Sequence, residues 1–595
     1  MDRLESAAAG FVRTGFRFGG FRLDADGTLS RGEAQIHLSP KELAALRLLL
    51  ANPGQIVTLQ EFKQALCDDA PALAEGVSKC LASLRKKLEP EECIETIYKR
   101  GYRFSAVVRT LSDPVGLPLR LAILPFAVEY GVPEYLGPAI ALEAGTRIEA
   151  ARSSGAHRTP VSTVARESVS TLARRGVAPQ QIGEMLKADL VLKGSIRALP
   201  AHYRLYAEMI YAADGSQAWA EDLLVERSRI AGLETELANL VSRRLNPDGL
   251  SIFAGAADTQ QEPEGIEHRR QAYECFQRGR FEWQTFERHR MQDALRHLLQ
   301  AIELDPGRTA ARVELAHLCI AQEIYGFMPP VVAAELVHRM ATAPGETAAD
   351  IEGLLPALGW ISFHADRNLP MALSCFRQAE HLPYEPWTMR TLTLLTLGRH
   401  RFGEAIALLE SVLRVDPWSP WPQGRLAWAH HLAGDVAVSR QLAHAALERF
   451  PLHEGVQLYC AMILAFNGEA ARAVELAGRL AQRLPYFDLA TGAHAYALAM
   501  AGQPDAAHGV LERFEWLSRE RYTLKTFSAA AYVALGETGK AIDVLRSAEH
   551  SRCPWLFEML ADPRLAPLHA EPEFQSMLAL LAGMEASAER DPPEA

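Results

Sequence analysis

Basic side chains gather between residues 79 and 103, at spacings that suit contact with a polyanion. Seven Lys or Arg residues fall in this stretch, against four Glu residues. Residues 71–88 carry apolar side chains at spacings of three and four, which predicts a helix seated on a core along one face. The other face carries small or cationic residues, namely Ser78, Lys79, Ala82, Ser83, Lys86 and Lys87. Such a helix can approach nucleic acid phosphates closely, although a solvated helix face has the same composition.

A β-hairpin with a basic tip is predicted directly after this helix. Glu89-Pro90 ends the helix, and two short apolar runs flank Tyr98-Lys99-Arg100-Gly101. A basic helix followed by a basic hairpin is the order of a winged helix. In that arrangement the helix enters the major groove, and the hairpin reaches the adjacent minor groove or its phosphates.

The elements that must position this basic helix and hairpin lie just before them. Residues 16–38 predict short strands separated by turns, and Ser39-Pro40 with Glu42 predicts a capped helix start. Thr58 and Glu61 form a second capping pattern. The free N–H groups beside Thr58 could hold a DNA phosphate, or Thr58 is a cap and nothing more.

The runs SLRKKLEP and IETIYKRGYRF resemble the recognition helix and wing of the OmpR/PhoB-type winged-helix family, and the resemblance covers residues 15–108. It implies a winged helix-turn-helix domain that binds promoter DNA sequence-specifically and regulates transcription. Pattern and resemblance together predict these DNA-binding residues: Thr58, Ser78, Lys79, Ala82, Ser83, Arg85, Lys86, Lys87, Tyr98, Lys99, Arg100 and Arg103. In this family the loop before the recognition helix can face RNA polymerase, which makes Asp68 and Asp69 candidates for that contact.

Charge is distributed unevenly along the chain. The 595 residues carry a net charge of −11, yet residues 15–108 hold 13 basic and 12 acidic residues. The acidic remainder should be repelled by DNA, which favours a single docking face. Eight scattered cysteines without a Cys-x-x-Cys pair argue against a disulfide framework or zinc site. The N-terminus lacks a secretory pattern, and no apolar run reaches the ~18 residues of a membrane span, so we expect a cytoplasmic protein.

Residues 119–245 predict an α/β domain. A buried-strand run at 121–126 is followed by helical periods and then by three strands with turns at Pro200-Ala201 and Asp214-Gly215. The stretches LAILPF, IGEMLKADLVLKGSIR and DGSQAWAEDL resemble the TolB N-terminal-like domain. We find neither a Gly-rich phosphate loop nor a Gly-x-Ser-x-Gly motif here. We therefore expect a structural or ligand-sensing domain without catalysis or cofactor.

A fixed period of 34 residues marks the C-terminal half. Residues 246–267 read as a linker rich in Gly, Ala, Pro and acids. The period appears in two series, Pro383, Pro417, Pro451 and Pro485, and Gly434, Gly468 and Gly502. This is the period of tetratricopeptide repeats, which predicts an all-α solenoid over residues 268–584 with a concave groove. Such a groove binds a protein partner, or the solenoid mediates self-association.

This order of domains is similar to that of HilA-like regulators. We expect neither the receiver domain of response regulators nor the membrane span that some winged-helix relatives carry. Two alternatives stay open, a tetratricopeptide scaffold and a signalling protein related to cyclase-associated repeat proteins. Residues 15–108 argue against the second alternative, because they are too few for a cyclase domain.

Overall fold

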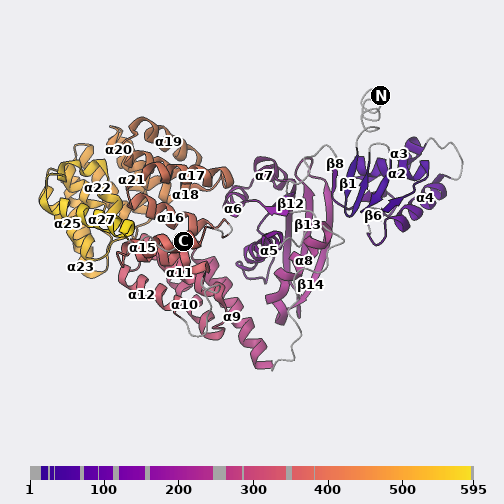
Figure 1. Ribbon diagram of the computed structural model, residues 1–595, viewed down its shortest axis with the longest axis horizontal. Coiled ribbons are helices and arrows are strands. Elements are labelled where there is room, and N and C mark those ends of the chain that lie inside the picture. The colour runs from indigo at the N-terminus through magenta and orange to yellow at the C-terminus, as the bar shows by residue number, and fades with distance from the viewer. Residues whose placement is uncertain are drawn as a thin grey trace. The chain divides into compact units, whose positions relative to one another are not determined.

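The structure is a computed structural model that describes residues 15–590, except 25–26, 33, 67–72, 92, 111–118, 154–160, 246–262, 285–286, 343–351, 381 and 383. The chain divides into two compact units, Met1–Arg270 and Gln271–Ala595. Figure 1 labels the elements of both units along the chain. Each unit is described separately below.

The first unit begins with an antiparallel sheet of short strands in the order β4-β3-β2-β1-β8. Their bounds are β1 Phe16–Phe18, β2 Phe21–Leu23, β3 Leu29–Arg31, β4 Ala34–Ile36 and β8 Val108–Thr110. Every pairing in this sheet is antiparallel. The alternating pattern buries Phe16, Phe18, Phe21 and Leu23 on one face.

Three helices and a second small sheet complete the winged helix. The helices are α2 Pro40–Ala51, α3 Leu59–Leu66 and α4 Leu73–Lys87. The sheet has the order β5-β7-β6, with β5 Ile56–Val57, β6 Ile94–Ile97 and β7 Gly101–Phe104. Phe104 of β7 meets Phe18 edge to face, with ring centroids 5.2 Å apart, and Tyr102 meets Phe62 in the same way at 5.8 Å. The two sheets and the helices thus share one core, as the sequence predicts.

The remainder of the first unit is an α/β layer built on a mixed sheet. The sheet order is β11-β9-β12-β13-β14, with β10 also paired to β12. Strands β11, β9 and β12 are parallel, whereas β12, β13 and β14 form an antiparallel meander. The strands are β9 Leu119–Ile123, β10 Ala127–Val128, β11 Val161–Thr163, β12 Leu190–Ala198, β13 His202–Tyr211 and β14 Gln217–Glu226. The helices are α5 Leu136–Ser153, α6 Arg166–Arg174, α7 Pro179–Met185 and α8 Leu233–Leu245, with the short turn η1 Arg227–Gly232 before α8. Both predicted turns, near residues 200 and 214, join neighbouring strands of the meander.

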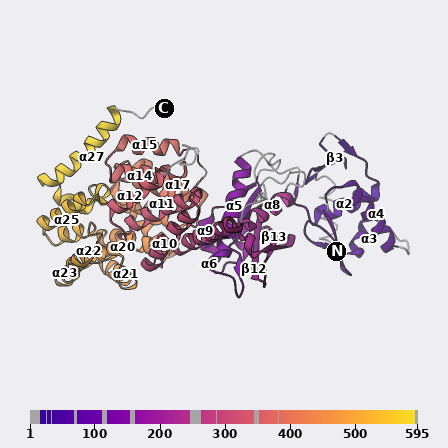
Figure 2. The ribbon, with the colours of Figure 1, turned by 90° about the horizontal axis from the view of Figure 1, so that it is seen from below.

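The second unit is helical throughout its described residues (Figures 1 and 2). Its first helices are α9 Pro263–Glu282, α10 Arg288–Leu304, α11 Thr309–Ile324, α12 Pro330–Ala341, α14 Leu355–His364, α15 Leu369–Gln378, α16 Pro386–Gly398 and α17 Phe402–Val415, with η2 Glu352–Leu354 before α14. The later ones are α18 Pro420–Leu432, α19 Val436–Arg449, α20 Glu454–Phe466, α21 Ala470–Arg483, α22 Asp488–Met500, α23 Pro504–Glu520, α24 Ser528–Ala534 and α25 Thr538–His550. Helix α9 begins inside the stretch expected to be a linker, because Pro263 starts a helix there and the acidic residues after it are good helix formers.

Glycines at the predicted 34-residue step end the first helix of successive pairs. Gly434, Gly468, Gly502 and Gly536 have φ angles of 83°, 85°, 70° and 80°. This left-handed conformation closes a helix C-terminus and is strained for residues with a Cβ. The period seen in the sequence is therefore the helix-turn-helix period of the fold. Gly536 extends it by one repeat beyond the glycines noted in the sequence.

The inner face of the repeat array is covered by the chain itself. The first helices of consecutive pairs, α18, α20, α22 and α24, lie side by side, and α16 lies against α14. The segment after α25 contains α26 Leu556–Met559 and η3 Pro563–Leu568, which lie against α16 and α24 respectively. Helix α27, Pro572–Arg590, then contacts both α25 and α15 (Figure 2). The groove expected from the repeat pattern is thus filled, and the array is closed.

Among the helices of the described ranges, none is both long enough and apolar enough to cross a bilayer.

Candidate nucleic-acid interface

The core side of α4 fixes which of its residues face outward. Val77, Leu81, Leu84 and Leu88 are at most 2% exposed. Their spacing follows one stripe of the helix, so the stripe opposite must point away from the core. The opposite stripe consists of exposed residues, namely Ser78, Lys79, Ala82, Ser83 and Lys86. Five of the predicted DNA-binding residues therefore share one exposed face of α4.

Two hydroxyls of this face are already hydrogen-bonded within the domain. The Ser78 hydroxyl lies 3.1 Å from the Tyr102 hydroxyl of β7. Ser83 donates to Oε1 of Glu42 at 2.7 Å. Both bonds tie α4 to neighbouring elements, so these two serines orient the helix as well as line its outer face.

Glu42 is the polar anchor beneath α4. Its Oε2 accepts from the backbone N–H of Ser39 at 2.6 Å and from Lys87 Nζ at 2.7 Å. Lys87 also donates to the carbonyl of His37 at 2.9 Å. Burial alone would raise the pKa of Glu42, but hydrogen bonds from Lys87, Ser83 and Ser39 outweigh it and lower the pKa to about 2. These hydrogen bonds hold the Lys87 ammonium against the rest of the domain.

Arg85 points to the wing and lies off the exposed stripe. Its Nε donates to the carbonyl of Ile94 at 2.9 Å, and its Nη2 donates to Oγ1 of Thr96 at 2.8 Å. The guanidinium carbon lies 5.7 Å from the centroid of the Tyr102 ring. Arg85 therefore joins the end of α4 to strand β6. Lys86, by contrast, is exposed and makes neither a hydrogen bond nor an ion pair with the described residues.

The wing tip presents three adjacent exposed side chains, Tyr98, Lys99 and Arg100. Tyr98 is 82% exposed, and Lys99 Nζ lies 5.3 Å from the centroid of its ring. Lys99 has a φ of 59°, a conformation that Gly or Asn adopts more readily. A Cβ on Gly101 would lie 2.1 Å from the backbone oxygen of Val57, so only glycine lets β7 pass β5 this closely.

The two remaining predicted contacts lie farther from the tip or are engaged locally. Arg103 is on β7 and forms an ion pair with Glu95 of β6, with Nη2 2.6 Å from Oε2. Thr58 caps α3: its N–H and hydroxyl both donate to Glu61 Oε2 at 2.7 Å, and its hydroxyl accepts from Glu61 N–H at 3.3 Å. Thr58 is nonetheless exposed.

Some of the interface was not visible in the sequence, and some lies outside the described residues. The pattern Ser39 to Glu42 predicts a helix cap, which is confirmed, but gave no sign that Glu42 also holds Ser83 and Lys87. Asp68 and Asp69, predicted to face RNA polymerase, lie outside the described residues. In the described part of the chain no cluster of three His, Cys, Asp or Glu side chains is arranged to hold a metal ion.

A family model and curated relatives are similar to parts of this chain. Residues 32–104 match the family model described as "Transcriptional regulatory protein, C terminal". The transcriptional regulator HilA of Salmonella typhimurium strain LT2 is 37% identical over 119 residues, which are 19% of this chain and 22% of that protein. HilA of Salmonella typhi matches with the same identity and coverage. The chain therefore covers about a fifth of the length of these curated relatives.

Solved structures are similar at low identity. The Cut9–Hcn1 hetero-tetramer of the APC/C is 13% identical, with a TM-score of 0.39, over 60% of this chain and 66% of that chain. Yeast Tom70 is 14% identical, with a TM-score of 0.32, over 88% of this chain and 94% of that chain. The family match falls on the winged helix. Residues 32–104 therefore belong to the OmpR/PhoB-type DNA-binding domains of transcriptional regulators, and the chain is similar to HilA over 119 residues.

Proposed function

We propose that this protein is a transcriptional regulator that binds promoter DNA through the exposed stripe of α4 and the wing tip. One observation carries the proposal. The apolar side of α4 is locked into the core, while Lys86 on its outer stripe and the wing-tip residues Lys99 and Arg100 stay exposed on one domain. A cationic helix face and a cationic hairpin tip are what a winged helix offers to a major groove and the adjacent minor groove.

The residues of this interface divide into contacting and positioning groups. Lys79 and Lys86 supply the major-groove or phosphate contacts, and Ala82 between them lets the helix approach closely. Tyr98, Lys99 and Arg100 reach the minor groove or its phosphates, with Thr58 offering a phosphate contact at the start of α3.

Residues held inside the domain shape this interface. Arg85 fixes the distance between α4 and the wing through Ile94 and Thr96. Lys87 fixes the end of α4 through Glu42, as Ser83 does one turn earlier. Arg103 stiffens the hairpin through its ion pair with Glu95. These side chains preorganise the contacting groups, which reduces the ordering cost of binding.

We further propose that the protein activates the promoters it binds. Asp68 and Asp69, which come between α3 and α4 in the sequence, are the proposed contact to RNA polymerase. A protein partner bound to residues 268–584 sets the output, because tetratricopeptide-type arrays bind proteins. No catalytic activity and no cofactor is part of the proposal.

The proposal is tested by measuring DNA binding of the full chain. Duplexes selected from a genomic fragment library by the wild type serve as ligands, and fluorescence anisotropy gives the affinity. The double change Lys99→Ala and Arg100→Ala should abolish specific binding, whereas Lys540→Ala, which removes an exposed lysine in the repeats, should leave it intact. If the wild type selects no sequence from the library, or if the wing variant binds as well as Lys540→Ala, the proposal is wrong.

A further inference from the structure

A stretch of chain lies buried inside the repeat array, at the place in the sequence where the first helix of the next pair would follow α25. Residues 553–560 are all buried, and they include the single helical turn α26. A one-turn helix on a surface exposes one side, so eight consecutive buried residues must be enclosed by other elements on every side. Those elements are the inner helices of the array. The segment thus lies where a bound peptide would lie in an open solenoid.

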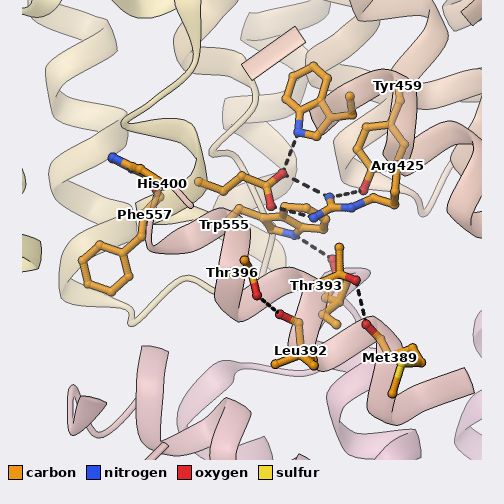
Figure 3. Close-up of polar contacts among 12 residues, drawn as sticks. Met389, Leu392, Thr393, Thr396, His400, Arg425, Tyr459, Trp555 and Phe557 are labelled. Atoms are coloured by element: carbon orange, nitrogen blue, oxygen red, sulfur yellow. Dashed lines mark hydrogen bonds and ion pairs between the residues drawn. The ribbon is translucent and has the colours of Figure 1, made fainter. Parts of the chain in front are cut away.

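A carboxylate of this segment is held by two side chains of α18. Arg425 of α18 forms a forked ion pair with Glu558, with Nη1 to Oε1 at 3.1 Å and Nη2 to Oε2 at 2.7 Å. Arg425 Nη1 also donates to the hydroxyl of Tyr459, which lies 34 residues later on α20. Trp428 Nε1 donates to Glu558 Oε1 at 2.6 Å. Figure 3 shows the Arg425 guanidinium beside the hydroxyl of Tyr459, to which it donates.

The aromatic residues of the segment occupy sites formed by distant repeats. Trp555 donates from Nε1 to the carbonyl of Ile324 at 2.9 Å, at the end of α11. Its ring lies 5.4 Å from that of Phe527, just before α24. The backbone oxygen of Phe557 accepts from His400 Nε2 at 2.8 Å, between α16 and α17 (Figure 3). One short segment thus touches repeats across the whole array.

A second charged pair in the segment also contacts inner helices of the array. Asp562 pairs with Arg564, and His431 of α18 lies 3.3 Å from its Oδ1. The Arg564 guanidinium stacks over Trp428 at 5.2 Å and over Tyr496, two repeats later, at 4.8 Å. Two inner-face positions that are two repeats apart, Trp428 and Tyr496, therefore hold the same group of the segment. Extended peptides in solenoid grooves are recognised in this way.

We infer that the inner face of α16 to α24 is a binding site for an aromatic and acidic peptide of the type Trp-x-x-Glu, and that residues 553–564 occupy it as an internal ligand. The segment is joined to the array by a short connection, so its effective concentration is of the order of millimolar or higher. A partner peptide of the same chemistry enters this site only when the segment leaves. This inference is independent of DNA binding by the winged helix.

The test uses the full chain and a fluorescent synthetic peptide of residues 552–565. The change Glu558→Gln keeps the shape of the internal segment but removes the charge that Arg425 binds. This variant should take up the peptide at least about tenfold more tightly than the wild type, because its internal competitor is weakened. A peptide that itself carries Gln in place of Glu should bind neither protein.

The matched control is Glu585→Gln on α27, which removes a carboxylate paired with Arg399 outside the site. It should take up no more peptide than the wild type. If the Glu558→Gln variant is folded by circular dichroism and still takes up no peptide, or if the Glu585→Gln control takes it up equally, the inference is overturned.

A second measurement does not depend on any variant. In the wild type, the amides of Leu556, Met559 and Leu560 donate within the segment, and they should exchange with solvent by a local opening. Their protection should be at least about tenfold below that of buried amides in α20. Equal protection would mean that the segment leaves only when the array unfolds, and the inference would be overturned.

Discussion

Two neighbouring cations at the end of α4 should respond differently to removal, although the sequence gives no reason to separate them. Lys86 is exposed without a partner among the described residues, whereas Arg85 is bound to Ile94 and Thr96 of the wing. Lys86→Ala should therefore remove a contact with DNA and leave the fold unchanged. Arg85→Ala should loosen the fold and leave the number of phosphate contacts unchanged.

The expected loss of DNA affinity for Lys86→Ala follows from counterion release. One lost phosphate contact lowers the slope of log affinity against log salt by about 0.9. At ~0.15 M salt this is a loss of about fivefold in affinity, or about 1 kcal/mol. Arg85→Ala removes two hydrogen bonds from a charged donor. At this half-exposed site the change lowers the free energy of unfolding by about 2 kcal/mol.

The assay is anisotropy with the selected duplex across a salt series of about 0.05–0.3 M, with hydrogen exchange of the amides of α4 and β6 measured in parallel. Lys86→Ala should flatten the salt slope and keep the wild-type exchange. Arg85→Ala should keep the slope, lower the affinity at every salt concentration and speed exchange in β6. If Arg85→Ala flattens the slope by about one and leaves exchange unchanged, Arg85 contacts DNA and the reasoning from its hydrogen bonds is refuted.

Three further results are expected for the winged helix. Glu42→Gln should remove the acid sensitivity of α4. The pKa of Glu42 is about 2 when folded and 4.5 when free, so its contribution of about 3 kcal/mol is complete above pH 4.5 and is lost as the pH falls to 2. The wild type should therefore lose hydrogen-exchange protection in α4 over that range, and an equal loss in the Gln variant would contradict this. Gly101→Ala should abolish DNA binding, because its Cβ meets the Val57 oxygen and forces β7 from β5; retained anisotropy at wild-type protein concentrations would count against it. Lys99→Gly should weaken DNA binding without loss of wing protection, because glycine accepts the φ of 59°; lost protection would show that the lysine stabilises the tip.

Short-range patterns were enough to predict much of the winged helix. Ser39 with Glu42, and Thr58 with Glu61, are confirmed as reciprocal caps. The spacing of Val77, Leu81 and the two leucines after them correctly gave the buried side of α4. These features depend on neighbours three or four residues apart, so they are readable in one sequence.

The hydrogen-bond partners of Arg85 and Lys87 were not predictable in the same way. Arg85 bonds Thr96 across a turn, and Lys87 bonds Glu42 at a separation of 45 residues. Periodicity places a side chain on a helix face, but it does not show whether another element supplies a partner for that side chain. The covering of the groove by residues 553–568 was not predictable for the same reason. Helix α27 begins 34 residues after α25, so the segment keeps the period, but the period does not show that the segment contacts α16 and α18.

Closure of the repeat array changes how this half of the molecule can vary. In an open array each repeat contacts only its neighbours, so repeats can be gained or lost by duplication and deletion with little effect elsewhere. Here Arg367, before α15, donates to the backbone oxygen of Glu549 at 3.1 Å, and Arg399 is paired with Glu585 of α27. An inserted or deleted repeat would pull both contacts apart at once. The number of repeats is therefore fixed by geometry. Apart from the local opening of residues 553–564, the helices should melt as a single cooperative body and should not fray from either end.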